Sequence, residues 1–266
     1  MTQRLDAALA ARGLSRSRTH AATLIAAGLV TVDGRGVVKA STPVADDAVL
    51  EVAGADHYVS RASHKLIAGL DAFEVDVRAR CALDIGASTG GFTQVLRERG
   101  AAPVIALDVG HGQLAASVAA DSGVIPIEGF NARELSPASL REASGVDTSP
   151  DVVTGDLSFI SLAHVLGPIR ATAARDADIV LLVKPQFEVG RTSVKGGLVT
   201  DAALRADAVS GVLWSAWDVG LGTLGVIASP IMGTHGNAEF LAHFASDRGR
   251  NPTEWLDTVS QLAGER

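Results

Sequence analysis

The sequence predicts an α/β fold in which helices cover a doubly wound, mostly parallel β-sheet. From Cys81 onward, short runs of β-branched and other apolar residues alternate with segments of helical pattern. Such strands, separated by helices of about ten residues, form right-handed βαβ units and therefore a parallel sheet. The composition agrees, because 47% of the residues are hydrophobic but only 4% are aromatic, as is typical of a buried parallel sheet.

The elements of this core follow one another along the chain. Strands are predicted at 81–86, 103–109, 123–129, 151–157 and 178–184, and helices at 91–100, 112–120 and 161–170. The single cysteine, Cys81, begins the first strand. It has no partner for an internal disulfide and forms no C-x-x-C pattern, so we interpret it as a buried packing residue and predict no metal site.

A small α+β domain is predicted ahead of this core, over residues 1–52. Leu5 and Leu9 lie one helical turn apart, and Gly13 is placed to end that helix. Ser15 is the predicted N-cap of a second helix.

Strands are expected to complete this small domain. They are predicted at 29–32 and 37–40, on either side of the turn dipeptide Asp33-Gly34, and at 48–52. Residues 53–60, AGADHYVS, contain glycine and polar residues between two periodic segments. They form the predicted linker, so that the core domain occupies 61–266.

The charge distribution points to a nucleic-acid partner for the N-terminal domain. The net charge of −7 argues against such a partner for the chain as a whole, because phosphates are bound by Lys and Arg. However, residues 1–39 hold six basic and two acidic residues. Arg16, Arg18 and His20 lie on the polar face of the second predicted helix.

No export or membrane-spanning segment is predicted. The first residues lack an apolar region behind a basic one, and no stretch of about 18 uncharged apolar residues occurs later. We therefore expect a soluble cytoplasmic protein without a membrane partner.

The turn after the first core strand is rich in glycine and fits a nucleoside-containing cofactor. Dinucleotide folds use G-x-G-x-x-G at this place, whereas this turn has G-x-x-x-G-G behind an aspartate. S-adenosylmethionine has no phosphate and needs close backbone approach to its methionine part, so the turn fits that cofactor better than a nicotinamide dinucleotide. The predicted cofactor-binding residues of the turn are Asp84, Gly86, Ala87, Ser88, Thr89, Gly90, Gly91 and Phe92.

Two later residues complete the predicted cofactor site. Asp108 ends the second core strand, where a carboxylate can accept hydrogen bonds from both ribose hydroxyls. Asn131 follows the third strand and is placed to meet the adenine edge. A nicotinamide enzyme is the alternative.

The fourth core strand ends in GDLSF at 155–159, where methyltransferases of this fold carry out their chemistry. The motif of enzymes that methylate exocyclic amines, a Pro-Pro-aromatic run, is absent there. Carbon-5 methylation of cytosine would need a cysteine near this strand, and the cysteine lies on the first one. The charged residues that remain as candidates are Lys65, Asp156, Lys184 and Glu239.

The order of these four residues resembles the Lys-Asp-Lys-Glu tetrad of the FtsJ-like 2′-O-ribose methyltransferases, which have a Rossmann-like class I fold. A ribose hydroxyl is a poor nucleophile, and a lysine can take its proton when a nearby cation lowers the pKa of that lysine. We assign Lys184 as the base and Lys65 as its neighbour, with Asp156 and Glu239 in positioning roles. A surface ion pair is the alternative for each residue taken alone.

The first 52 residues resemble the S4 RNA-binding domain through L-x-x-x-L-x-x-x-G-L-x-x-S-R-x-x-A-x-x-L-I-x-x-G-x-V-x-V-D-G. The resemblance implies that the second helix lies against structured RNA. The residues predicted to bind RNA are Arg4, Arg12, Arg16, Arg18, His20, Lys39 and Arg61. A solvated basic face on a small helical cap is the alternative.

The chain as a whole resembles the TlyA, or hemolysin A, family of rRNA 2′-O-methyltransferases through SRASHKL, DIGASTGGF, GDLSFISL and VKPQFEVG. The resemblance implies 2′-O-methylation of cytidine in 23S and 16S rRNA, with S-adenosylmethionine as cofactor. It also implies ribosomal RNA or ribosomal subunits as partner. We expect the chain to be a monomer. A pore-forming hemolysin and a non-catalytic RNA-binding protein are the alternatives. The tetrad and the cofactor turn favour an enzyme, and the sequence offers a pore-former no membrane-spanning helix and no export signal.

Overall fold

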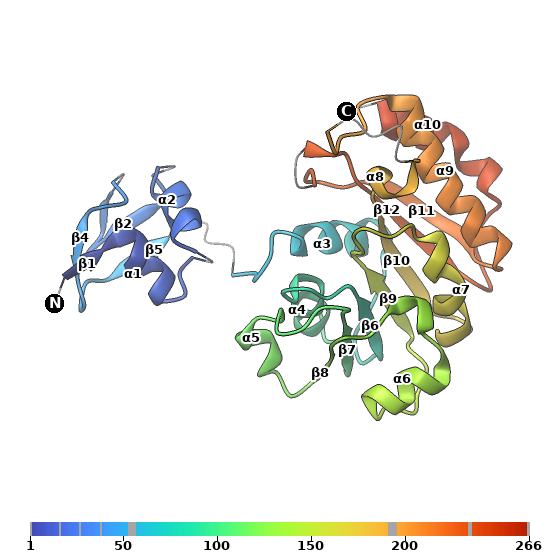
Figure 1. Ribbon diagram of the computed structural model, residues 1–266, viewed down its shortest axis with the longest axis horizontal. Coiled ribbons are helices and arrows are strands. Elements are labelled where there is room, and N and C mark those ends of the chain that lie inside the picture. Colours follow the sequence, from blue (N-terminus) through green and yellow to red (C-terminus); the bar gives the residue numbers. More distant parts are fainter. Residues whose placement is uncertain are drawn as a thin grey trace. The chain divides into compact units, whose positions relative to one another are not determined.

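The computed structural model of this protein describes residues 2–15, 17–26, 28–37, 39–52, 57–190, 196–233 and 236–264. The chain forms two compact units, Met1–Val59 and Ser60–Arg266. Figure 1 shows the first unit in blue and the second in cyan to red. The division falls within residues 53–60, where the sequence predicts a linker.

The N-terminal unit packs two helices against two small antiparallel sheets. The elements are α1 (Leu5–Ala11), α2 (Arg18–Ala26), β1 (Thr2–Arg4), β2 (Val30–Val32), β3 (Arg35–Gly36), β4 (Pro43–Ala45) and β5 (Leu50–Val52). β1 pairs with β4, while β2 lies between β3 and β5. The core between helices and strands includes Leu5, Leu9, Ile25 and Val30, none of which has exposed surface.

Two details of this unit differ from the sequence prediction. Ser17, not Ser15, caps α2, because its Oγ accepts the backbone N–H of His20 at 3.1 Å. Asp33-Gly34 does form the predicted turn, with φ angles of +49° and +75°. The strand that pairs after this turn is β3, which begins earlier than the predicted 37–40 because a two-residue turn lets pairing resume at once.

The second unit is built on a seven-stranded sheet in the order β11-β12-β10-β9-β6-β7-β8. Its strands are β6 (Ala82–Ile85), β7 (Val104–Leu107), β8 (Val124–Ile127), β9 (Val152–Gly155), β10 (Asp178–Val183), β11 (Gly222–Ala228) and β12 (Phe240–Ala245). The first five of these pair in parallel, whereas β12 is antiparallel to both β10 and β11. The predicted doubly wound, mostly parallel sheet is therefore confirmed (Figure 1).

Helices cover both faces of this sheet. They are α3 (Ser63–Ala72), α4 (Gly91–Glu98), α5 (Ala116–Ala119), α6 (Pro137–Ser144), α7 (Ala163–Thr172), α8 (Pro185–Glu188), α9 (Ala202–Asp218) and α10 (Leu256–Gly264). α7, α9 and α10 pack on the face that carries Leu83 and Leu181. α3 lies on the opposite face, where a Cβ added to Gly69 would be 3.3 Å from Leu241 and 3.4 Å from Val180. Among the helices of the described residues, none is long and apolar enough to cross a membrane.

The topology collects polar residues at one edge of the sheet. Asp108, Asp156 and Lys184 directly follow β7, β9 and β10, whose carboxyl ends meet at this edge. Because β12 is antiparallel to β10, its first residue lies at the same edge, and Glu239 directly precedes it. Cys81 lies at the other end of β6, 5% exposed and packed in the core, as predicted.

Candidate active site

The turn between β6 and α4 depends on its glycines. Gly86 and Gly90 have φ angles of +79° and +94°, a conformation that glycine adopts without strain. A Cβ at Gly90 would lie 2.8 Å from Leu114 Cδ1, and a Cβ at Gly91 would lie 2.8 Å from Ser60 Cβ. Larger residues would therefore push the turn away from its neighbours.

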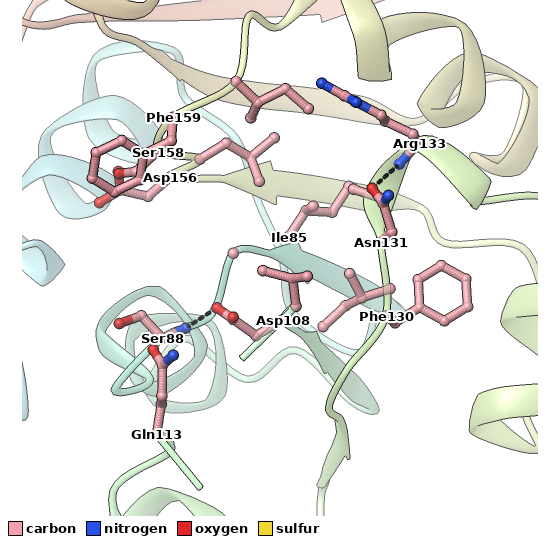
Figure 2. Close-up of a pocket in the computed structure, with 16 residues that line it drawn as sticks. Ile85, Ser88, Asp108, Gln113, Phe130, Asn131, Arg133, Asp156, Ser158 and Phe159 are labelled. Atoms are coloured by element: carbon pink, nitrogen blue, oxygen red, sulfur yellow. Dashed lines mark hydrogen bonds between the residues drawn. The ribbon is translucent and has the colours of Figure 1, made fainter. Parts of the chain in front are cut away.

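A cavity of about 450 Å³ opens beside this turn, among the loops that follow β6, β7, β8 and β9 (Figure 2). Ser88 N donates to Asp108 Oδ2 at 2.8 Å, and Gly110 N donates to Oδ1 at 2.7 Å. These bonds fix the Asp108 carboxylate and leave each oxygen with further acceptor capacity. Asn131 also lines the cavity, and its Oδ1 accepts the backbone N–H of Arg133 at 3.1 Å.

A smaller cavity of about 140 Å³ adjoins the first and is lined in part by Lys184. The residues that line both cavities are Gly86, Ser88, Asp156 and Ser158. The other predicted cofactor residues along the smaller cavity are Ala87, Thr89, Gly91 and Phe92. Gly90 lines neither cavity, and its contribution is the left-handed backbone of the turn.

Asp84 is buried next to the glycine turn and lines neither cavity. Its side chain has no exposed surface, and its carboxylate accepts hydrogen bonds from Thr93 Oγ1 at 2.7 Å and Thr154 Oγ1 at 2.9 Å. Burial raises the pKa of this carboxyl to about 7, although both hydrogen bonds act in the opposite direction. Asp84 therefore ties α4 to β9, and its influence on a ligand passes through the turn.

The four predicted catalytic residues meet in a row of alternating charge. Lys65 Nζ lies 2.5 Å from Glu239 Oε2 and 4.0 Å from Asp156 Oδ2. Lys184 Nζ lies 2.6 Å from Asp156 Oδ1. The exposed fractions of these side chains range from 3% for Glu239 to 17% for Asp156. The alternative of separate surface ion pairs is therefore wrong.

Two further side chains, which the sequence analysis did not single out, hold the loops around this row. Lys184 donates to Ser158 Oγ at 2.7 Å. The Glu188 carboxylate accepts hydrogen bonds from Ser161 Oγ at 2.6 Å and from Leu162 N at 3.0 Å, and its burial raises its pKa. Ser158 lies within the motif GDLSFISL and Glu188 within VKPQFEVG, and these motifs are the sequence signal that could have identified the two residues.

The row contains ammonium and carboxylate groups and the cavities adjoin it, so the arrangement suits proton transfer to a lysine beside a bound small molecule. Within the described parts of the chain, no group of three or more His, Cys, Asp or Glu is arranged to hold a metal ion.

Three of the predicted RNA-binding arginines, Arg4, Arg12 and Arg18, make contacts within the N-terminal unit. Arg4 and Arg18 pair with Asp6 at 2.9 and 3.1 Å, and their side chains stay 52% and 61% exposed. The hydrogen bond from Arg4, together with that from Arg18, lowers the pKa of Asp6 to about 2. Arg12 donates to the backbone carbonyls of residues 45, 46 and 48, which fixes it within the unit.

Three further residues of the predicted RNA-binding set are described by the structure: His20, Lys39 and Arg61. Lys39 is exposed, and His20 is half-buried on α2. Arg61, also exposed, belongs to the second unit. Arg16 lies outside the described residues. An RNA-binding role for all of these residues stays a prediction.

Each of the two units matches a known protein family. Residues 58–246 match the FtsJ-like methyltransferases, and residues 3–50 match the S4 domain. This chain belongs to the FtsJ-like methyltransferase family. The match spans the whole seven-stranded sheet with its glycine turn and all four residues of the charged row, so the predicted Rossmann-like methyltransferase fold is confirmed.

The similarity to several known proteins extends over nearly the full length of the chain. The 16S/23S rRNA (cytidine-2′-O)-methyltransferase TlyA of Mycobacterium tuberculosis is 51% identical over 267 residues, covering 98% of this chain and 97% of that protein. Hemolysin A of Brachyspira hyodysenteriae is 39% identical and covers 91% of this FtsJ-like chain and 99% of its own. A solved structure described as a hemolysin from Streptococcus thermophilus has a TM-score of 0.76 at 34% identity, over 99% of this chain and 95% of that one.

Proposed function

We propose that this chain transfers a methyl group from S-adenosylmethionine to the ribose 2′-hydroxyl of a cytidine in ribosomal RNA. The observation that carries the proposal is the buried row of Glu239, Lys65, Asp156 and Lys184, which ends in a lysine at a cavity beside the glycine turn. Membership in the FtsJ-like family supports it. So does the similarity to TlyA, which is named as a cytidine-2′-O-methyltransferase of 16S and 23S rRNA.

The residues beside the glycine turn fit S-adenosylmethionine. The larger cavity, of about 450 Å³, has the size of a small-molecule site. Asp108 has acceptor capacity for the two ribose hydroxyls, and Asn131 keeps its NH₂ group as a donor. Because the two cavities share Gly86 and Ser88, a bound nucleoside can extend from the larger cavity toward the charged row.

The charged row supplies a base and its support. When bound, S-adenosylmethionine supplies a methyl group on a sulfonium, which a ribose oxygen can accept once its proton is removed. Lys184 is placed to take that proton, because its side chain lines the smaller cavity. Asp156 stabilises the ammonium that results, at 2.6 Å. Lys65 lies 4.0 Å from the Asp156 carboxylate and helps to position it, and Glu239 in turn pairs with Lys65 at 2.5 Å.

This assignment is favoured over the two alternatives. Removing charged side chains from water costs stability, and pairing them offsets this only in part. A protein that only binds RNA would gain nothing from such a buried row of charges. A pore-forming hemolysin leaves the same row and the glycine turn without a role. The S4 unit supports a structured RNA, such as that of a ribosomal subunit, as the substrate.

The test is to identify the methylated atom and the base. Large and small ribosomal subunits are incubated with the protein and S-adenosylmethionine, and the RNA is digested to nucleosides for mass spectrometry. We expect 2′-O-methylcytidine from the wild type. Lys184→Ala should lower turnover at least about 100-fold, the usual range for loss of a general base, with cofactor affinity retained.

Lys184→Arg is the matched control, because arginine keeps the charge beside Asp156 but does not act as a base. We expect it to be as inactive as the alanine variant, whereas a purely electrostatic lysine would be replaced by arginine with little loss. A methyl group on a base, or near-normal single-turnover rates in Lys184→Ala, would contradict the proposal.

A further inference from the structure

Ser158 is the most accessible polar group next to the Lys184 amine. About 10% of the Lys184 side chain and 17% of the Asp156 side chain are exposed. Ser158 is exposed and lines both cavities, and it lies beside Asp156 at the cavity wall in Figure 2. Its Oγ accepts a hydrogen bond from Lys184 at 2.7 Å.

The two polar contacts of Lys184 differ in kind. Asp156 Oδ1 lies 2.6 Å from Nζ, yet among the described residues this buried oxygen accepts no hydrogen bond of good geometry. Charge attraction alone does not set a direction, whereas a hydrogen bond does. The contact that orients the amine is therefore the bond to Ser158, while the Phe187 ring, with its centroid 5.9 Å away, packs beside the amine.

We propose that Ser158 is a positioning residue for methyl transfer, which orients Lys184 Nζ at the smaller cavity. The inference rests on the proposed function, in which Lys184 is the base. A serine hydroxyl suits this task because it can accept an N–H from lysine in either protonation state. The attraction of Asp156 depends on the positive charge and weakens when the amine is neutral, which is the state that must accept the proton.

Three variants of the full-length protein test this role. Ser158→Ala removes the hydroxyl, and Ser158→Thr keeps a hydroxyl at this exposed position. Ser161→Ala is the matched control, because it removes a hydroxyl from the same loop that bonds Glu188 and not Lys184. Cofactor affinity is measured by calorimetry, and single-turnover methylation of ribosomal subunits is followed from about pH 6 to 10.

Ser158→Ala should lower the maximal rate at least about tenfold, because misplacing a reacting group is costly in rate. It should also move the rising limb of the pH–rate profile to lower pH by about half to one unit, because a lost hydrogen bond to the ammonium disfavours the charged amine. Ser158→Thr should restore both, and cofactor affinity should stay within about twofold. Ser161→Ala should leave the pH midpoint unchanged.

Three results would overturn the inference. They are a Ser158→Ala protein with the rate and pH profile of the wild type, a loss of cofactor affinity that accounts for the loss of rate, and a threonine variant that restores neither property. If the wild type methylates ribose and Ser158→Ala has the same rate and pH profile as the wild type, only this inference fails. If the wild type places its methyl group on another atom, the proposed function fails with it.

Discussion

Asp84 should make the stability of the catalytic unit fall as pH rises toward neutrality. Its carboxyl has no exposed surface, and burial raises its pKa from an ordinary 3.8 to about 7. Between these values the folded protein keeps a proton that the unfolded chain has released. Since stability changes with pH as the difference in bound protons, the contribution of Asp84 to the free energy of unfolding is fully present below pH 3.8 and is lost progressively as the pH rises to about 7.

The size of the effect follows from the shift. A difference of about three pH units, at about 1.4 kcal/mol each, amounts to about 4 kcal/mol over the whole window. Asp84→Asn should remove this dependence while preserving the packing. The amide can accept from the hydroxyl of Thr93 or Thr154 and donate to the other, because each hydroxyl can rotate.

The assay is urea unfolding of wild type and variant from about pH 5 to 8, followed by tryptophan fluorescence. All three tryptophans lie in the second unit, so the signal reports on that unit alone. Asp121→Asn is the control, because a hydrogen bond from Arg97 lowers the pKa of Asp121 and places its effect below this pH range. Parallel pH curves for wild type and Asp84→Asn would refute the reasoning.

Two further predictions concern the ligands. Asp108→Ala should weaken S-adenosylmethionine binding more than tenfold, or about 1.4 kcal/mol, because it removes the ribose acceptor and releases Ser88 N and Gly110 N; unchanged affinity in calorimetry, or tight binding of NAD, would contradict the cofactor assignment. Arg18→Glu should weaken binding to ribosomal RNA and reduce its salt dependence by about one charge, with cofactor affinity intact, because the side chain is mostly exposed on α2. Equal RNA affinity of wild type and variant at low salt would place the docking face elsewhere.

The parallel part of the sheet could be predicted because its strands are local signals. β10, DIVLLV, is an uninterrupted apolar run, and all six residues are buried. The antiparallel edge has no such signal. β12, FLAHFA, carries His243 in its middle, and this buried ring is satisfied by Asp178, which lies 65 positions away at 2.9 Å. β11 begins at Gly222 and is interrupted by Gly225, so its pattern also fails to identify a strand from the sequence.

The membership of the charged row could be predicted, but its pairing could not. Lys184 and Asp156 follow strands that the sequence identifies, so their proximity follows from the parallel sheet. Glu239 reaches the row because β12 is antiparallel, which the sequence did not indicate. Asp84 lies near the end of β6, where the sequence predicts a cofactor contact. Its carboxylate instead accepts hydrogen bonds from Thr93 and from Thr154 of the neighbouring strand β9, and the sequence does not indicate this pairing.

The contact between Lys65 and Glu239 joins positions 174 residues apart, and Glu239 enters with β12, which inserts between β10 and β11. During synthesis, Lys65 leaves the exit tunnel long before its carboxylate partner. The glycine turn can form early from the neighbouring β6 and α4, but the charged row is complete only after β12 has joined the sheet. A chain that ends before β12 therefore keeps the glycine turn but has no carboxylate partner for Lys65.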